Sequence, residues 1–404
     1  MYVGKVIYYP ARFPLSILDR VWRKIETTKN PIENVIDPFM GSGISCIYSI
    51  KNSCDFIGYD LNPLSCFFVS TLFVRLDESH TQKIEALVDD MFSSNDEFEP
   101  DWPNINYWYD EAILNVLKKA WGFIHSNVRI GCDCAIDPTN PDDAVWLLLA
   151  FVLLKVSRKY SYADDSVAKL YRSRFKERAL NAILKKADEN IEKLIRKDVE
   201  SIARRAFKLA IDNTEASTNI YIEGGVDVVS DKLTLNEADL LLTSPPYMIA
   251  HEYTRSTKLE LYWLGYPHTF IKWMRKHEIP YNTCMDKVND ITIYSKCYQK
   301  YKKLVMKRNP RLLCYYVRYF KSIAKVFEKL EIRQYAAIFV GEATLAGMRI
   351  PIPKILEEHL SSLGFKKVYL IRDPIRARKL FKGRKNPNPT GIKEEHLLLL
   401  KVVD

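Results

Sequence analysis

Short apolar runs alternate with helical patterns at both ends of the chain, which predicts a sheet covered by helices. An apolar run from Asn34 is followed by Asp37 and a glycine turn, residues 44–50 have helical spacing, and a second apolar run ends on Asp60. Later segments continue the pattern, with strands expected at 219–229, 238–243, 335–343, 365–373 and 394–403, and a helix at 352–363. Strands separated by helices indicate an α/β fold with a mainly parallel sheet.

The middle of the chain has a different texture, with long helical periods and few strand-like runs. Helices are predicted at 110–124 and 140–159 and over the highly charged stretch 174–212. Asn140 and Pro141 suit the N-cap and first turn of the second of these helices. We therefore expect a largely helical insertion in the sheet domain.

These patterns divide the chain into three segments. Residues 1–63 form the first part of the sheet domain, 64–219 form the helical insertion, and 220–404 complete the sheet domain. Residues 248–330 are aromatic and basic and are expected to be helical. Neither the insertion nor 248–330 is needed to build the sheet, so both are candidates for recognising a target.

The charge of the chain favours a polyanionic partner. Among 404 residues, 60 Lys and Arg outnumber 50 Asp and Glu, a formal net charge of +10. Basic residues are dense in 155–207, 272–309 and 372–393. We expect phosphate contacts there, with a solvated basic surface as the alternative. The candidate DNA-contacting residues are Arg255, Arg376, Arg378, Lys379, Lys382 and Arg384.

Cysteine usage and hydropathy indicate an intracellular protein. The eight cysteines include no CxxC pair, and Cys132 and Cys134 lack a second half with metal-ligand spacing, so reduced thiols and no metal site are expected. The longest apolar run, 144–154, is shorter than the ~20 residues that a membrane span needs. A soluble, cytoplasmic protein is expected.

The glycine turn and Asp60 together suggest a nucleoside site. Glycines at the carboxyl end of a strand let the backbone approach a ligand, as in Asp37-Pro38-Phe39-Met40-Gly41-Ser42-Gly43. Asp60 ends the next strand, where its carboxylate can accept both hydroxyls of a ribose. Alone, such a turn is equally consistent with a simple tight turn. A dehydrogenase fingerprint would need a third glycine after Gly43, and a P-loop would need Gly-Lys-Ser/Thr; both are absent.

These motifs, with the strand end Thr243-Ser244-Pro245-Pro246-Tyr247, resemble the S-adenosylmethionine-binding and catalytic motifs of DNA amino-methyltransferases of restriction-modification systems. The resemblance implies a Rossmann-like class I methyltransferase fold. The segment 8–14 is similar to the family's N-terminal segment over the methionine part of the cofactor, and Asp227 matches its adenine-end acid. The cofactor-binding residues so implied are Tyr9, Ala11, Phe13, Asp37, Pro38, Phe39, Gly41, Gly43, Asp60 and Asp227.

The rigid turn after the strand suits the chemistry of amine methylation. An exocyclic amine is a poor nucleophile until acceptors hold its nitrogen, and the Ser244 hydroxyl and the Pro245 carbonyl can supply them. Pro246 completes the turn, and Tyr247 offers a stacking surface for a base flipped out of duplex DNA. An edge strand that ends in a packing tyrosine is the structural alternative. Asp227 has the corresponding alternative of a turn aspartate.

Several functions compete with this hypothesis. Methylation at carbon 5 of cytosine is disfavoured because no cysteine follows a proline. A guanine-N2 methyltransferase acting on RNA, a non-catalytic DNA-binding subunit and a dehydrogenase remain as rivals. Serine before the two prolines is typical of relatives that act on cytosine N4, so that base is favoured over adenine N6. A restriction endonuclease encoded nearby is an expected partner.

Overall fold

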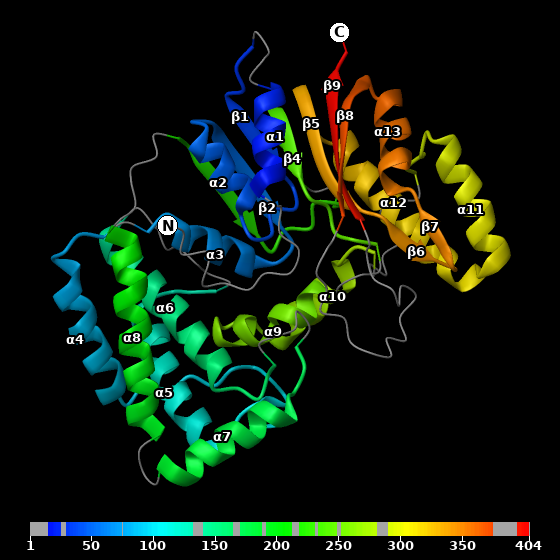
Figure 1. Cartoon of the computed structure of the whole chain (residues 1–404). Coiled ribbons are helices and arrows are strands. Elements are labelled where there is room, and N and C mark those ends of the chain that lie inside the picture. The colour runs from blue at the N-terminus through cyan, green and yellow to red at the C-terminus, as the bar shows by residue number, and fades with distance from the viewer. Residues whose placement is uncertain are drawn as a thin grey trace. The chain divides into compact units, whose positions relative to one another are not determined.

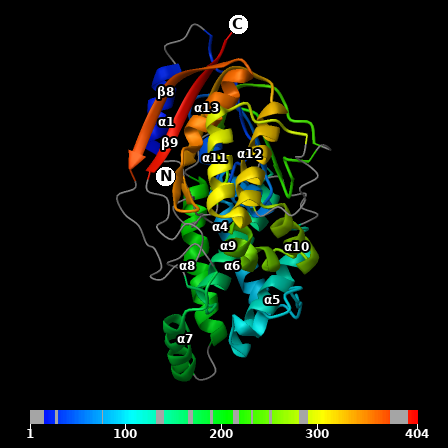
Figure 2. The ribbon, with the colours of Figure 1, turned by 90° about the vertical axis from the view of Figure 1, so that its right-hand side faces the viewer.

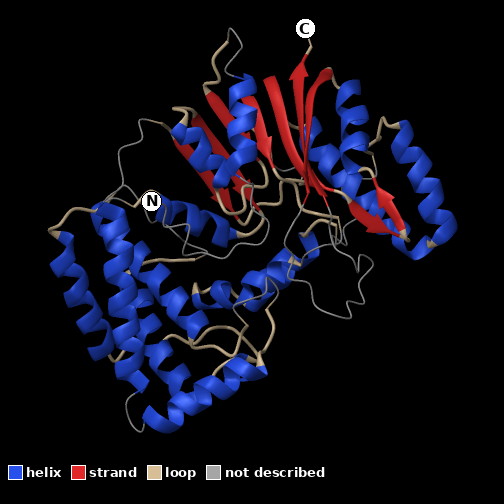
Figure 3. Ribbon diagram, viewed as in Figure 1, coloured by secondary structure: helices blue, strands red, loops and turns tan. Residues whose placement is uncertain are grey.

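The computed structural model describes residues 15–25, 30–74, 76–131, 140–164, 170–187, 191–211, 218–230, 233–248, 252–280, 290–374 and 394–403. Contacts within the chain divide it into two compact units. One contains Cys66–Glu215 and Tyr253–Trp273, and the other contains Ala11–Ser65, Ala216–Glu252 and Met274–Asp404. Named strands occur in the second unit, whereas the described part of the first is built from helices (Figure 3).

A seven-stranded sheet in the order β3-β2-β1-β4-β5-β9-β8 organises the second unit. Its strands are β1 (Asn34–Asp37), β2 (Asp55–Asp60), β3 (Ile220–Gly224), β4 (Ala238–Thr243), β5 (Ile332–Gly341), β8 (Phe365–Pro374) and β9 (Glu394–Val402). The five strands β1 to β5 are parallel to one another, and β9 runs antiparallel between β5 and β8. The short strands β6 (Ala343–Leu345) and β7 (Met348–Ile350) form a separate hairpin. The predicted α/β, Rossmann-like class with a mainly parallel sheet is confirmed.

Helices cover both faces of this sheet (Figures 1 and 2). Helices α1 (Leu15–Ile25) and α2 (Ile44–Lys51) lie on one face, and the Tyr48 hydroxyl of α2 donates to Asp19 of α1 at 2.5 Å. Helices α11 (Lys296–Arg308), α12 (Leu313–Glu328) and α13 (Ile352–Ser362) lie on the other, as Figure 2 shows.

The large core of this unit lies under α11 to α13. Strand residues such as Leu241 and Ile338 meet Phe320 of α12 and Ile355 of α13 in one buried cluster. Burying these side chains is the main favourable term for the fold. Strand β4 is buried at all its positions, as expected for a central strand with helices on both faces.

The first unit is a helical bundle around α6. Its helices are α4 (His80–Ser93), α5 (Glu111–Asn127), α6 (Pro141–Lys159), α7 (Arg174–Ala187), α8 (Ile191–Ile211) and α9 (Tyr253–Trp263). Helices α3 (Pro63–Leu72) and α10 (His268–His277) span the divisions between the units along the chain. The Asn140 side chain caps α6 by accepting from the Asp142 N–H at 3.0 Å, as predicted. Because α6 is apolar around most of its circumference, it is buried by its neighbours.

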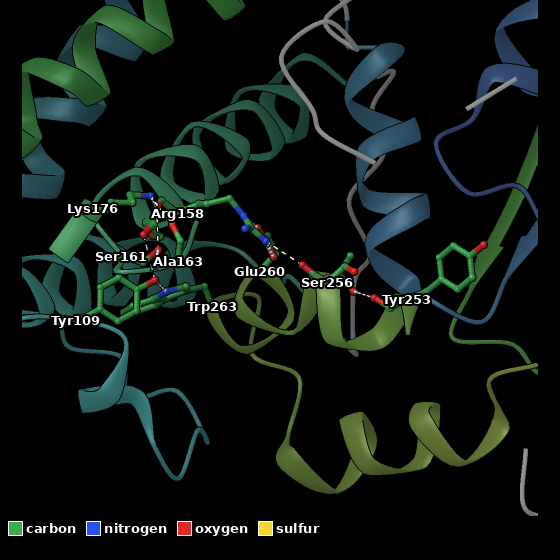
Figure 4. Close-up of polar contacts among 11 residues, drawn as sticks. Tyr109, Arg158, Ser161, Ala163, Lys176, Tyr253, Ser256, Glu260 and Trp263 are labelled. Carbon is green, nitrogen blue, oxygen red and sulfur yellow. Dashed lines mark hydrogen bonds and ion pairs between the residues drawn. The ribbon is translucent and has the colours of Figure 1, made fainter. Parts of the chain in front are cut away.

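Helix α9 follows the Ser-Pro-Pro-Tyr turn in sequence but belongs to the helical unit. Arg158 of α6 forms an ion pair with the buried Glu260 of α9 and donates to the Ser256 carbonyl at 2.8 Å (Figure 4). The Trp263 indole donates to the Tyr109 hydroxyl at 2.8 Å. Paired and hydrogen-bonded in this way, the buried charge of Glu260 is compensated. These contacts explain why Tyr253–Trp273 groups with the insertion.

Among the described residues, none of the helices has the length and apolar character of a membrane span, and no group of His, Cys, Asp and Glu side chains is arranged to hold a metal ion. Cys46, Cys54, Cys66, Cys297 and Cys314 form no disulfide among the described residues. The strand expected at 219–229 is wrong in length, because β3 ends at Gly224 and Gly225 adopts a left-handed φ of 76°.

Candidate functional site

The loop between β1 and α2 is held tightly against the end of β2. Gly41 and Gly43 have left-handed φ values of 54° and 73°, which favour glycine. The Gly41 N–H donates to Oδ2 of Asp60 at 2.7 Å, and the Met40 N–H donates to the Tyr59 carbonyl at 2.9 Å. Gly43 then caps the start of α2. The predicted glycine turn is therefore an ordered loop at the carboxyl edge of the sheet.

Asp37 lies at the centre of this edge. Its Oδ1 accepts from the Phe39 N–H at 2.9 Å and from the Thr243 hydroxyl at 2.6 Å, and its Oδ2 accepts from the Ser45 hydroxyl at 2.6 Å. Burial raises the pKa of Asp37 to about 6, although these hydrogen bonds oppose the shift. One carboxylate thus joins the glycine loop and α2 to the end of β4, the strand that leads into Ser244.

Asp60 is the second carboxylate of the edge. Its Oδ1 accepts from the Asn62 N–H at 2.7 Å, and its Oδ2 accepts from Gly41. Burial raises its pKa to about 6, against the effect of hydrogen bonds from Asn62, Gly41 and Ser65. The three donors Asn62, Gly41 and Ser65 share two oxygens that together have about four acceptor sites, so the group can still accept from a ligand hydroxyl.

Asp227 lies in the loop after β3. The Val226 N–H donates to the Asp60 carbonyl at 3.1 Å, which holds this loop beside the end of β2. The Asp227 carboxylate accepts from the Val229 N–H at 3.1 Å in a local turn. Asp227 is therefore a turn residue next to Asp60, and its role toward a cofactor stays a prediction.

The Ser-Pro-Pro-Tyr turn begins where the buried strand β4 ends at Thr243. Ser244 is partly exposed, and its hydroxyl makes no hydrogen bond to any other described residue, whereas Pro245 is buried. The Tyr247 hydroxyl donates to Glu395 of β9, and the residue is only 5% exposed. A base can stack on this ring only if neighbouring groups move, so the stacking role of Tyr247 stays a prediction.

Several predicted site residues are not among those that the structure brings together at the carboxyl edge of the sheet. Arg255 is exposed on α9 in the helical unit, and its DNA contact stays a prediction. The following candidates lie outside the described residues: Tyr9, Ala11, Phe13, Arg376, Arg378, Lys379, Lys382 and Arg384.

Three residues have roles at this edge that the sequence did not predict. Thr243 begins the predicted motif and Ser45 follows the glycine turn, and their hydroxyls donate to the carboxylate of Asp37. A polar residue that ends an otherwise apolar strand was the available signal for Thr243. Glu395 had no local signal, because its contact with Tyr247 joins residues far apart in sequence.

The Thr243 hydrogen bond gives a direct test of this arrangement. Thr243→Val keeps the side-chain volume but removes a donor to the buried Asp37, which should lower the free energy of unfolding by about 2 kcal/mol. Urea denaturation measures the difference, and Thr243→Ser, which keeps the hydroxyl, is the control. Equal stability of the two variants would contradict the coupling of β4 to Asp37.

Comparisons with known proteins match the part of the chain that contains the glycine loop and Asp60. Residues 4–66 match a family model described as DNA methylase. The chain is 22% identical over 392 residues to the type II methyltransferase M.MvaI of Kocuria varians, covering 87% of this chain and 79% of that protein. It is 33% identical over 141 residues to the type II methyltransferase M.MjaII of Methanocaldococcus jannaschii, covering 35% of this chain and 26% of that protein.

Proposed function

We propose that this chain, a relative of the DNA amino-methyltransferases of restriction-modification systems, transfers a methyl group from S-adenosylmethionine to the exocyclic amine of a DNA base. One observation carries the proposal. Asp37 accepts from Phe39 in the glycine loop and from Thr243, the residue before Ser244. The glycine loop and the Ser-Pro-Pro-Tyr turn are therefore connected by hydrogen bonds to one buried carboxylate, that of Asp37.

The residues of the edge suit the cofactor. Asp60 offers its remaining carboxylate lone pair to a ribose hydroxyl, and its place beside Gly41 puts this carboxylate next to a loop that leaves backbone room. Asp227, held beside β2 through Val226, suits the adenine end. The carboxylates also favour a cationic ligand over a neutral one. We propose these residues as the cofactor-binding set.

The chemistry needs positioning more than a nucleophilic side chain. When bound, S-adenosylmethionine supplies an electrophilic methyl group on a sulfonium. The Ser244 hydroxyl and the Pro245 carbonyl accept hydrogen bonds from the amine N–H groups and so direct the nitrogen lone pair out of the ring plane. As the C–N bond forms, the bond between the methyl carbon and the sulfonium would break and the sulfur would leave as a neutral thioether. Ser244 and Pro245 would stabilise the positive charge that develops on the nitrogen, which then loses a proton to water. Thr243, bound to Asp37, holds the turn in place.

Cytosine N4 is the base that we propose, with adenine N6 as the alternative. The support is Ser244, since serine at this position is typical of relatives that act on cytosine. A hydroxyl and a carboxylate both accept from an amine, so the pocket around the turn must also contribute. Duplex DNA is the proposed substrate, and a cognate endonuclease encoded nearby is the proposed partner in the cell.

The purified chain should transfer radioactive methyl groups from S-adenosylmethionine to duplex DNA and not to tRNA. Mass spectrometry of nucleosides from the product should then show N4-methylcytosine, because Ser244 and Pro245 would hold that amine. N6-methyladenine alone would refute the base assignment but keep the class of reaction. Transfer to tRNA and not to DNA would refute the proposed substrate.

A further inference from the structure

Helix α7 of the helical unit is fixed along one face. The Lys176 ammonium donates to the carbonyls of Arg158 and Ala163, each at 2.9 Å (Figure 4). Leu180 is buried on the same side of the helix. Residues 176 and 180 are four apart, so they lie on one face. This face holds α7 in a defined orientation in its unit.

The single acid of α7, Glu177, is paired with Arg172, which precedes the helix. Glu177 accepts from Nε and Nη2 of Arg172 at 3.1 and 2.6 Å, in a bidentate pair. This pairing lowers the pKa of Glu177. Its charge is therefore largely compensated by Arg172, and the nearby Arg174 and Arg178 also lower its pKa. The cations of α7 outnumber this one acid and dominate the local potential.

A basic stripe runs along the outward face. Arg174, Arg178 and Lys185 are all exposed. Arg178 and Lys185 follow Arg174 by 4 and 11 residues, which puts all three on one side of a helix with 3.6 residues per turn. At 1.5 Å per residue, the stripe is roughly 16 Å long. Three cations spread over this length can each contact a phosphate of the duplex DNA backbone.

An apolar stripe lies beside the basic one. Phe175 is 84% exposed and Ile183 is 43% exposed, with the exposed Ala179 and Ala182 between them. A phenylalanine side chain that is 84% exposed makes little contribution to the core of its own unit. Aromatic side chains between cations are typical of surfaces that bind nucleic acid, where they contact sugars or bases.

We propose that the outward face of α7, Arg174, Phe175, Arg178 and Lys185, is a DNA-binding surface. The three cations contact backbone phosphates, and Phe175 packs against a sugar or base edge. This inference rests on the proposed function only in taking duplex DNA as the partner. The excess of basic over acidic residues on this face matches DNA better than a protein partner.

The test is the salt dependence of binding to a labelled 40-bp duplex of mixed sequence, measured by fluorescence anisotropy. In Arg174→Gln/Arg178→Gln/Lys185→Gln, the slope of log K against log salt should become less steep by about 2 to 3, the value for losing three phosphate contacts. In Phe175→Ala, affinity should fall by about fivefold with the slope unchanged, because an apolar contact releases no counterions.

A matched control removes the same charge from elsewhere in the unit. Lys83→Gln/Lys119→Gln/Arg129→Gln neutralises three exposed residues outside the predicted basic stretches and should keep the wild-type slope. A wild-type slope in the α7 triple variant would overturn the inference and leave the face to a protein partner. Equal slope changes in both triple variants would also overturn it. Absence of duplex binding by the wild-type chain would refute both this inference and the proposed substrate, whereas binding without methyl transfer would refute only the proposed function.

Discussion

Ser244→Ala should lower the rate of the methyl-transfer step by about a hundredfold, the usual scale for losing one positioned polar group. The hydroxyl is partly exposed at the end of β4 and makes no hydrogen bond to another described residue, so it is available to an amine. Affinity for S-adenosylmethionine and for duplex DNA should stay near the wild-type value. Single-turnover kinetics with saturating DNA and cofactor measures the chemical step directly.

A second variant separates the loss of an acceptor from damage to the turn. Ser244→Asp restores an acceptor at the same position and should recover part of the rate lost in Ser244→Ala. Near-wild-type turnover by Ser244→Ala would remove Ser244 from the catalytic set. Equal inactivity of both variants with reduced thermal stability would show that the position serves the fold instead.

Affinity for S-adenosylmethionine should fall about tenfold between pH 7 and pH 5. The pKa values of Asp37 and Asp60 are both raised to about 6 by burial, so these carboxyls gain protons over this range. A protonated carboxyl is a weaker acceptor for ribose hydroxyls and no longer attracts a cation. Calorimetric titration at several pH values measures the change. Asp60→Asn should bind more weakly at pH 7 and lose most of the dependence on pH.

The free energy of unfolding should show the opposite trend. The folded pKa of Asp37 is above the unfolded value of 3.8, so between about pH 4 and 6 the folded chain keeps a proton that the unfolded chain has lost. Stability from this group is therefore present at low pH and falls as the pH rises through this window, by about 3 kcal/mol. Urea denaturation of wild type and Asp37→Asn, in which this slope should be reduced, checks the sign. A cofactor affinity that changes with pH in parallel with stability would contradict the ligand role of these carboxylates.

Local patterns predicted most elements because each depends on residues close in sequence. The N-cap of α6 by Asn140 follows from a side chain two residues from its partner, the Asp142 N–H. The end of β2 at Asp60 follows from a buried apolar run that stops at a charge. The extent of β3 was predicted wrongly because apolar residues continue beyond Gly224, whereas the chain turns at Gly225. Apolar content alone does not distinguish a strand from a buried loop.

The placement of β9 shows what such patterns omit. Its apolar run predicts a buried strand, but nothing local specifies that it pairs antiparallel with both β5 and β8. Pairing brings Glu395 to the Tyr247 hydroxyl, 148 residues away in sequence. The grouping of α9 with the helical unit has the same origin, because the partner of Glu260 is Arg158, 102 residues earlier.

The sequence by itself determined the α/β class, most of the elements, and the motifs at Asp37 to Gly43, Asp60 and Ser244 to Tyr247, since these depend on short-range spacing and residue chemistry. Only the tertiary structure decided that Asp37 is shared by the glycine loop and Thr243, and that Tyr247 is buried against β9. The contacts of Thr243 with Asp37 and of Tyr247 with Glu395 join segments that meet only when the sheet forms. Burial then sets the raised pKa of Asp37, because desolvation depends on how many chain segments surround the carboxyl group.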